Sequence, residues 1–138
     1  MSVASSLFGW LPSRKAAAQK RRQAHRKALA GLEFTAAELG NELQRLADIS
    51  QSSEPDDAAA VVRESAATSR ILDSLARGES FASALSDDEG ARAWRELAAS
   101  AGRARLLGQG PHRAARLRAV AEECEHLQQH IDEELARL

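Results

Sequence analysis

The sequence predicts an all-α protein, folded as an antiparallel bundle of about four helices with long first and last helices. Val, Ile and Thr together number nine in 138 residues and Tyr is absent, whereas Ala, Leu, Glu and Arg are abundant. Strands favour β-branched and aromatic residues, and helices favour the abundant ones. Apolar stripes with steps of three and four residues occur near both ends of the chain, as in coiled-coil-like seams.

The first predicted helix begins at Ser13, which can cap it, and runs to about Ser50. Glycine weakens a helix interior, so a bend is expected near Gly31. The apolar stripe of this helix consists of Leu29, Leu32, Ala36, Leu39, Leu43 and Leu46.

Residues 50–57 are predicted to be a loop that leads into a second helix ending near Arg77. Ser53 is its expected N-cap, Pro55 fits its first turn, and Gly78 is expected to stop it. One face of this helix is weakly apolar, so we expect it to be the least tightly packed of the four. That face carries Ala58, Val62, Ser65, Ser69, Leu72 and then Leu75 or Ala76.

The third helix is predicted to start at a capping box in which Ser86 and Glu89 satisfy each other's free backbone donors. A short helical turn over residues 80–85 precedes it. The break at residues 108–111 separates it from a fourth helix that runs to the C-terminus. The third helix should bury Trp94, Leu97, Ala101 and Ala104. The stripe of the fourth helix is Leu117, Val120, Cys124, Leu127, Ile131, Leu135 and Leu138.

The supply of large apolar residues, 30 in all, is thin for a monomeric core of this size. We therefore predict a homo-oligomer in which the Leu-rich stripes of the first and last helices pair between copies. The predicted oligomer seam is Leu29, Leu32, Leu39, Leu43, Leu46, Leu117, Val120, Leu127, Ile131 and Leu135.

The net charge of −1 hides a strong asymmetry along the chain. Residues 1–32 contain seven basic and no acidic residues, whereas residues 33–138 contain 12 basic and 20 acidic ones. The sequence therefore predicts a basic N-terminal arm over residues 1–28 and a helical bundle body over residues 29–138. Such an arm suits a polyanion, an anionic membrane, or the acidic body of this or a neighbouring chain.

Apolar and aromatic residues precede the basic cluster, a composition typical of an interfacial membrane anchor or of a segment that docks on a protein. Basic residues also neutralise nucleic-acid phosphates, which leaves a nucleic-acid-binding accessory role as the alternative. The plainest alternative is an ordinary solvated helix face with the aromatic residues covering the bundle end. The predicted partner- or membrane-binding residues are Leu7, Phe8, Trp10, Leu11, Arg14, Lys15, Lys20, Arg21, Arg22, Arg26 and Lys27.

No motif in the sequence predicts an enzyme, a metal site or a cofactor. His126 and His130 are four residues apart, and Glu123-x-x-His126 has a di-iron spacing. A di-iron bundle needs two such motifs, and these histidines lie off the apolar seam. The residues after His25 do not match the phosphotransfer pattern of a lysine three positions on and a glycine immediately after it. An enzyme or phosphocarrier centred on these histidines therefore remains the less favoured class.

Cys124 is the only cysteine, which excludes an internal disulfide and fits a reducing compartment. No run approaches the roughly 18 apolar residues that span a bilayer. The basic cluster follows the apolar patch, unlike a secretory signal, although residues 1–32 share the acid-free composition of an organellar transit peptide. We expect a cytoplasmic location, possible also at the periphery of a membrane.

Together these features predict a non-enzymatic helical scaffold or adaptor that self-associates. It is expected to dock a protein partner or an anionic membrane surface through its basic arm.

Overall fold

The computed structural model describes residues 3–52 and 57–138, and the side chains within residues 14–52 and 57–138. Four helices make up this part of the chain, and it contains no strand. They are α1 (Val3–Ser52), α2 (Ala58–Leu85), α3 (Glu89–Arg105) and α4 (Pro111–Arg137). The predicted all-α class is confirmed.

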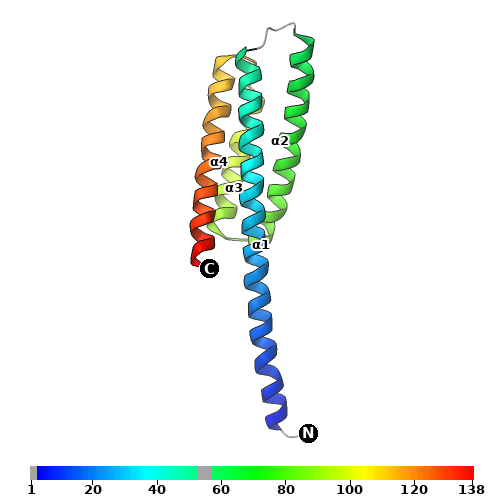
Figure 1. The fold of residues 1–138 in the computed structure, drawn as a ribbon, viewed down its shortest axis with the longest axis vertical. Helices are drawn as coiled ribbons and strands as arrows, with labels where there is room; N and C mark the ends of the chain where they lie inside the picture. Colours follow the sequence, from blue (N-terminus) through cyan, green and yellow to red (C-terminus); the bar gives the residue numbers. More distant parts are fainter. Residues whose placement is uncertain (1–2, 53–56) are drawn as a thin grey trace.

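The four helices form an antiparallel bundle in which consecutive helices are neighbours (Figure 1). α1 packs against α2 and α4, and α3 lies across the bundle from α1. At about 1.5 Å per residue, α1 is about 75 Å long and α4 only about 40 Å. The N-terminal part of α1 therefore projects beyond the end of the bundle at which α4 finishes.

Three of the four predicted apolar stripes form the core. The α1 stripe from Leu29 to Leu46 is fully buried, and Trp94 of α3 is 0% exposed. The α4 stripe is buried from Leu117 to Ile131, whereas Leu135 is half-buried at the end of the bundle. The 3–4 spacing of these residues predicted their inward face correctly, because bulky side chains with that spacing can be covered only by other helices.

The prediction for α2 was wrong in two respects. Gly78 does not stop the helix, which continues to Leu85, and the predicted face points outward, with Val62 69% and Leu72 45% exposed. The buried face consists mainly of small residues: Ala60, Ala67, Ile71, Ser74, Gly78, Ala82 and Leu85. These let the helix approach closely, and the indole of Trp94 occupies the space beside Gly78.

The helix caps also differ from the prediction. Asp57 caps α2 by accepting from the backbone N–H groups of Ala59 and Ala60, while Ser53 and Pro55 lie outside the described residues. Asp88 caps α3, so the predicted capping box does not form. Ser86 instead adopts a positive φ of 54° in the turn.

α1 begins at Val3 rather than at Ser13, and it runs through Gly31 as one helix. Because Gly31 has no side chain, the ring of Phe81 in α2 can pack directly against α1 at this position. A Cβ on residue 31 would collide with that ring. Glycine therefore marks a close contact between two helices at this position, not a boundary between arm and body.

At the end of the bundle opposite to the projecting part of α1, a buried arginine connects the helices. This residue is Arg113, near the start of α4. Its guanidinium lies 2.6 Å from the Glu64 carboxylate of α2 and donates to the backbone carbonyl of Arg105 at 2.8 Å. It also donates to the Ser50 hydroxyl of α1 at 3.4 Å. One side chain thus links all four helices where the loops leave their termini unpaired.

Candidate functional site

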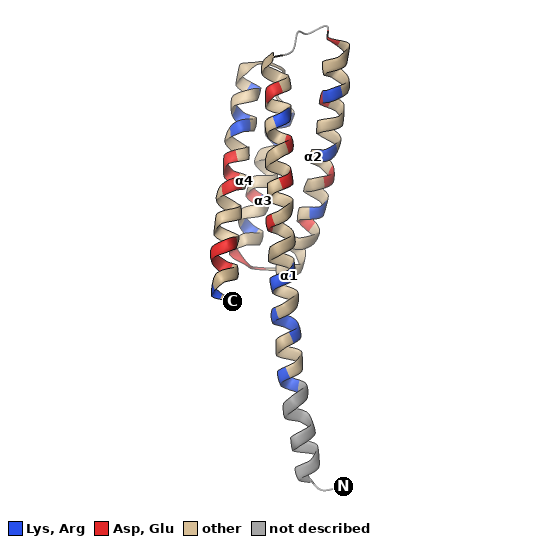
Figure 2. Ribbon diagram, in the orientation of Figure 1, with Lys and Arg blue, Asp and Glu red and all other residues tan. Residues whose placement is uncertain are grey.

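The basic residues of the arm lie on the projecting part of α1, where every described lysine and arginine from 14 to 27 is exposed (Figure 2). Residues seven apart share a helix face, so Lys15 and Arg22 lie on one side and Lys20 and Lys27 on another. Arg14 and Arg21 occupy a third side, and only alanines are interspersed as apolar residues. This segment is therefore positively charged all round and has no apolar face.

The apolar residues predicted to insert into a membrane or a protein groove are Leu7, Phe8, Trp10 and Leu11. Their side chains lie outside the described residues.

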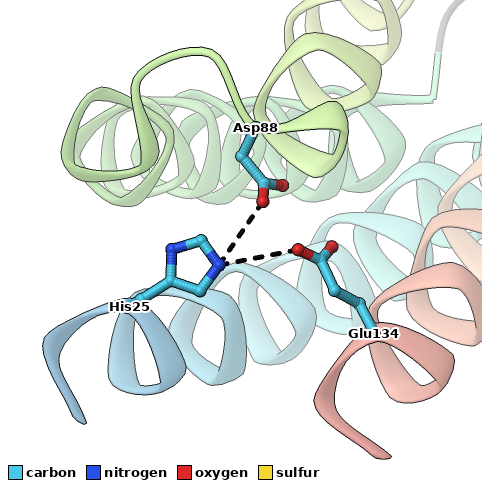
Figure 3. Close-up of side chains that lie close together, drawn as sticks. All are labelled: His25, Asp88 and Glu134. Atoms are coloured by element: carbon cyan, nitrogen blue, oxygen red, sulfur yellow. Dashed lines mark ion pairs between the residues drawn. The ribbon is translucent and has the colours of Figure 1, made fainter. Parts of the chain in front are cut away.

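A histidine marks the place where α1 leaves the bundle. His25 lies one turn before Leu29, the first fully buried leucine of the seam, and its side chain is 34% exposed. It points toward two carboxylates, Asp88 at the start of α3 and Glu134 near the end of α4 (Figure 3). These side chains are only 11% and 18% exposed, respectively. Three helices thus contribute one side chain each to a partly enclosed cluster.

The distances in this cluster place one nitrogen between two carboxylates. His25 Nε2 is 3.4 Å from Asp88 Oδ2 and 3.5 Å from Glu134 Oε1. Both distances exceed the usual 2.7–3.2 Å or so of an N–H···O hydrogen bond. Asp88 Oδ1 accepts from the Gly90 backbone N–H at 2.7 Å, and this cap fixes the orientation of the carboxylate. Glu134 Oε2 is buried and has no hydrogen-bond partner among the described residues.

The environment of Glu134 disfavours its negative charge. Burial raises the pKa of its carboxyl group, and hydrogen bonding to and repulsion from Asp88 raise it further, with His25 acting in the opposite direction. A second carboxyl pair lies two turns further along α1. There burial, then hydrogen bonding to and repulsion from Asp132, raise the pKa of Glu33 to about 7. Glu33 and Glu134 therefore both favour the protonated form more than an exposed glutamate does.

The histidines that drew attention in the sequence are separate from this cluster. His126 is exposed, and His130 Nε2 lies 3.8 Å from Glu89 Oε2. Within the described residues, His25, Asp88 and Glu134 make the only group of three side chains with ligand atoms close enough to share a metal ion. Cys124 lies in the core, where burial raises the pKa of its thiol to about 12 and leaves it unreactive.

The predicted oligomer seam is used within one chain. Nine of its ten residues, all but Leu135, are between 0% and 5% exposed in the isolated chain. They pack against other helices of the same molecule, because the four helices together supply the apolar surface that the sequence suggested a second copy would provide. Self-association of the protein through these or other residues stays a prediction.

Sequence reasoning missed the roles of Asp88 and Glu134. Both are ordinary helix-end carboxylates in the sequence, and they are far from His25 along the chain. The one available signal is the register of His25, which continues the α1 seam one turn beyond Leu29.

Comparison of the chain with protein-family models, with curated proteins and with solved structures finds no match. None of the described helices is long and apolar enough to cross a membrane.

Proposed function

We propose that this protein is a non-enzymatic helical adaptor that docks an anionic partner through the projecting basic segment of α1, residues 14–27. The observation that carries the proposal is the exposure of this segment. Its lysines and arginines are exposed, although Leu138 at the end of α4 lies beside Arg22 and Arg26. The first buried side chain of α1 among the described residues is Ala28, at 7% exposed. A cytoplasmic location, inferred from the single cysteine, belongs to the same proposal.

Four cations of the segment are available for intermolecular contacts. Within the described residues, Lys20, Arg21, Arg22 and Arg26 form no ion pair with a carboxylate of the chain, whereas many arginines of the body do. Arg77, for example, lies 2.7 Å from Glu38 across α1 and α2. The acidic body and the basic segment therefore keep their charges largely apart, which favours capture of a polyanion over internal neutralisation.

Nucleic acid is the anionic partner that the segment fits best, because its charges surround the helix. A helix lying on a membrane needs an apolar face, which residues 14–27 lack. A helix with its side chains is about 10–12 Å across and fits the major groove of DNA, where phosphates flank it on both sides. An anionic membrane, reached through Phe8 and Trp10, is the competing partner.

Charge reversal tests the proposal. The triple variant Arg21→Glu, Arg22→Glu, Arg26→Glu should lose binding to duplex DNA, measured by fluorescence anisotropy at several salt concentrations. Wild-type affinity should fall steeply with salt, as expected for release of counterions. The matched control reverses three exposed arginines of the body and changes net charge equally: Arg92→Glu, Arg103→Glu and Arg116→Glu.

The outcomes separate the partners. DNA binding that is lost in the arm variant and kept in the control supports the nucleic-acid adaptor. A different result would identify a membrane as the partner. In that case the protein would bind vesicles that contain anionic lipid but not DNA, and the double variant Phe8→Ser, Trp10→Ser would abolish vesicle binding. Equal losses in both charge variants would leave only non-specific charge attraction and refute docking through α1.

Self-association, if it accompanies docking, requires exposed apolar side chains, and α2 supplies them. Val61 is 57% exposed, Val62 69% and Leu72 45%, all on the outer side of this helix. We infer that this face is the contact between copies. Light scattering should give a multimeric mass that Val62→Glu reduces to that of one chain. A single-chain mass for the wild type would refute self-association.

A further inference from the structure

We propose that His25, Asp88 and Glu134 form a binding site for one divalent transition-metal ion, with Zn²⁺ as the ion that fits best. The site would clamp α1, at the point where it leaves the bundle, to the start of α3 and the end of α4. This inference is independent of the partner that the basic segment binds.

Two of the three separations between the ligand atoms already match those that zinc requires. Zn²⁺ bonds imidazole nitrogen and carboxylate oxygen at about 2.1 Å, so two ligands at a tetrahedral angle lie about 3.4 Å apart. His25 Nε2 is 3.4 Å from Asp88 Oδ2 and 3.5 Å from Glu134 Oε1, and all three atoms lie within 4.8 Å of one another. An ion between them needs only small side-chain movements.

A single nitrogen facing two carboxylates calls for a shared cation. The Nε2 atom carries either one hydrogen or one lone pair, so it cannot donate well to two carboxylates at once. A divalent ion accepts the lone pair and also neutralises both carboxylates, which are mostly buried. Asp88 and Glu134 repel each other while both are ionised, and a cation between them removes that repulsion.

The protein orients one of the ligands, Asp88, independently of any ion. Asp88 uses Oδ1 to cap α3, which leaves Oδ2 directed at the site. Glu134 is carried by the last turns of α4, beside the half-buried Leu135. The cap on Asp88 is the kind of supporting contact that orients a metal ligand.

The donor set selects among metals. One imidazole nitrogen with two carboxylates suits Zn²⁺ and its transition-metal neighbours, whereas Mg²⁺ prefers oxygen ligands and retains several waters. A tetrahedral ion held by these three ligands would have one position left for a water molecule. Three protein ligands and a water give the full coordination number of four.

Calorimetric titration of the metal-free full-length protein with ZnCl₂ tests the site. We expect one equivalent of Zn²⁺ to bind, and the thermal midpoint to rise with Zn²⁺ and to return on addition of EDTA. Three variants each remove one ligand with little change of shape: His25→Gln, Asp88→Asn and Glu134→Gln. Asn caps a helix about as well as Asp, so Asp88→Asn keeps the cap of α3. Each variant should bind Zn²⁺ at least about tenfold more weakly.

The matched control is His126→Gln with His130→Gln, which removes the two histidines of the α4 surface. It should bind Zn²⁺ as the wild type does. Substitution with Co²⁺ supplies a second readout, because a four-coordinate nitrogen–oxygen site gives visible absorption bands that the Glu134→Gln variant should lose. Zinc binding that all three ligand variants retain, or that only the control loses, would overturn the proposal. So would a wild-type protein that binds no Zn²⁺.

Discussion

Gly78 is a residue whose role depends on a single neighbour. A Cβ at this position would lie 1.8 Å from Cζ2 of Trp94, which is completely buried and has no room to move. Gly78→Ala should therefore lower the free energy of unfolding by about 3 kcal/mol, although alanine is the better helix former. Urea denaturation measures the loss.

The matched control is Gly102→Ala in α3. A Cβ at this position would have no described atom within 4 Å other than those of its chain neighbours and the nearby backbone of its own helix. This substitution should raise the free energy of unfolding by about 0.5–1 kcal/mol, the ordinary helical advantage of alanine. If the two variants behaved alike, the close contact between Gly78 and Trp94 would be wrong.

Glu33 should make stability depend on pH. Its pKa in the folded chain is about 7, raised from 4.5, so between these values the folded state binds more protons than the unfolded state. The free energy of unfolding must then fall as pH rises through this interval. At about pH 8, Glu33→Gln should be more stable than the wild type by about 1–2 kcal/mol, a value reduced for screening by solvent.

Thermal melts between about pH 5 and about pH 8 check this prediction through the difference between the two proteins. Glu134, whose pKa is also raised, is present in both proteins, so its contribution cancels in the difference. A constant difference across the range would show that Glu33 titrates normally.

At the scale of elements, the turn between α2 and α3 offers a direct test of its caps. Ser86 has φ 54° and ψ −110°, a conformation that favours glycine. Ser86→Gly should therefore stabilise the protein by about 0.5–1 kcal/mol, whereas Ser86→Ala should give no such gain. In the capping box that the sequence suggested, both substitutions would remove the side-chain cap and destabilise α3. The midpoint of urea unfolding distinguishes these alternatives.

The helices that could be predicted well are those whose inward face is large and aliphatic. Large aliphatic residues recur with helical spacing from Leu29 to Leu46 and from Leu117 to Ile131, and both stripes are buried. The hydrophobic effect favours burial of such a stripe, so its inward direction can be predicted from the sequence. α2 could not be predicted in the same way, because its buried face is made of small residues. Ala67 and Gly78 contribute by permitting close approach, and that depends on Trp94 from another helix.

The same reasoning explains why the histidine–carboxylate cluster was not foreseen. Its members come from three helices, and Asp88 and Glu134 look like common helix-end residues in the sequence. Only the antiparallel arrangement, which brings the start of α3 and the end of α4 beside His25, creates the site. A pattern along one helix, such as His126 and His130, is visible in a sequence; a group assembled across helices is not.

For the molecule as a whole, the important division lies within α1. Residues 29–46 belong to the packed core, whereas residues 14–24 have no buried side chain. A helix without tertiary packing is marginally stable in water. Amide hydrogens of residues 14–24 should therefore exchange orders of magnitude faster than those of residues 29–46, although both lie in one helix. Uniform protection along α1, measured by NMR or mass spectrometry, would mean that another surface covers the projecting part.

Deletion of residues 1–24 tests whether the two parts of α1 are independent. The deletion keeps His25 and every fully buried residue of the described chain, so the free energy of unfolding should change by no more than about 0.5 kcal/mol. DNA binding should be lost with Arg21 and Arg22, whereas the rise of the thermal midpoint with Zn²⁺ should persist. The truncated chain could instead lose both DNA binding and the response to Zn²⁺ while circular dichroism shows that it is still folded. That result would mean that the arm and the bundle form one functional unit.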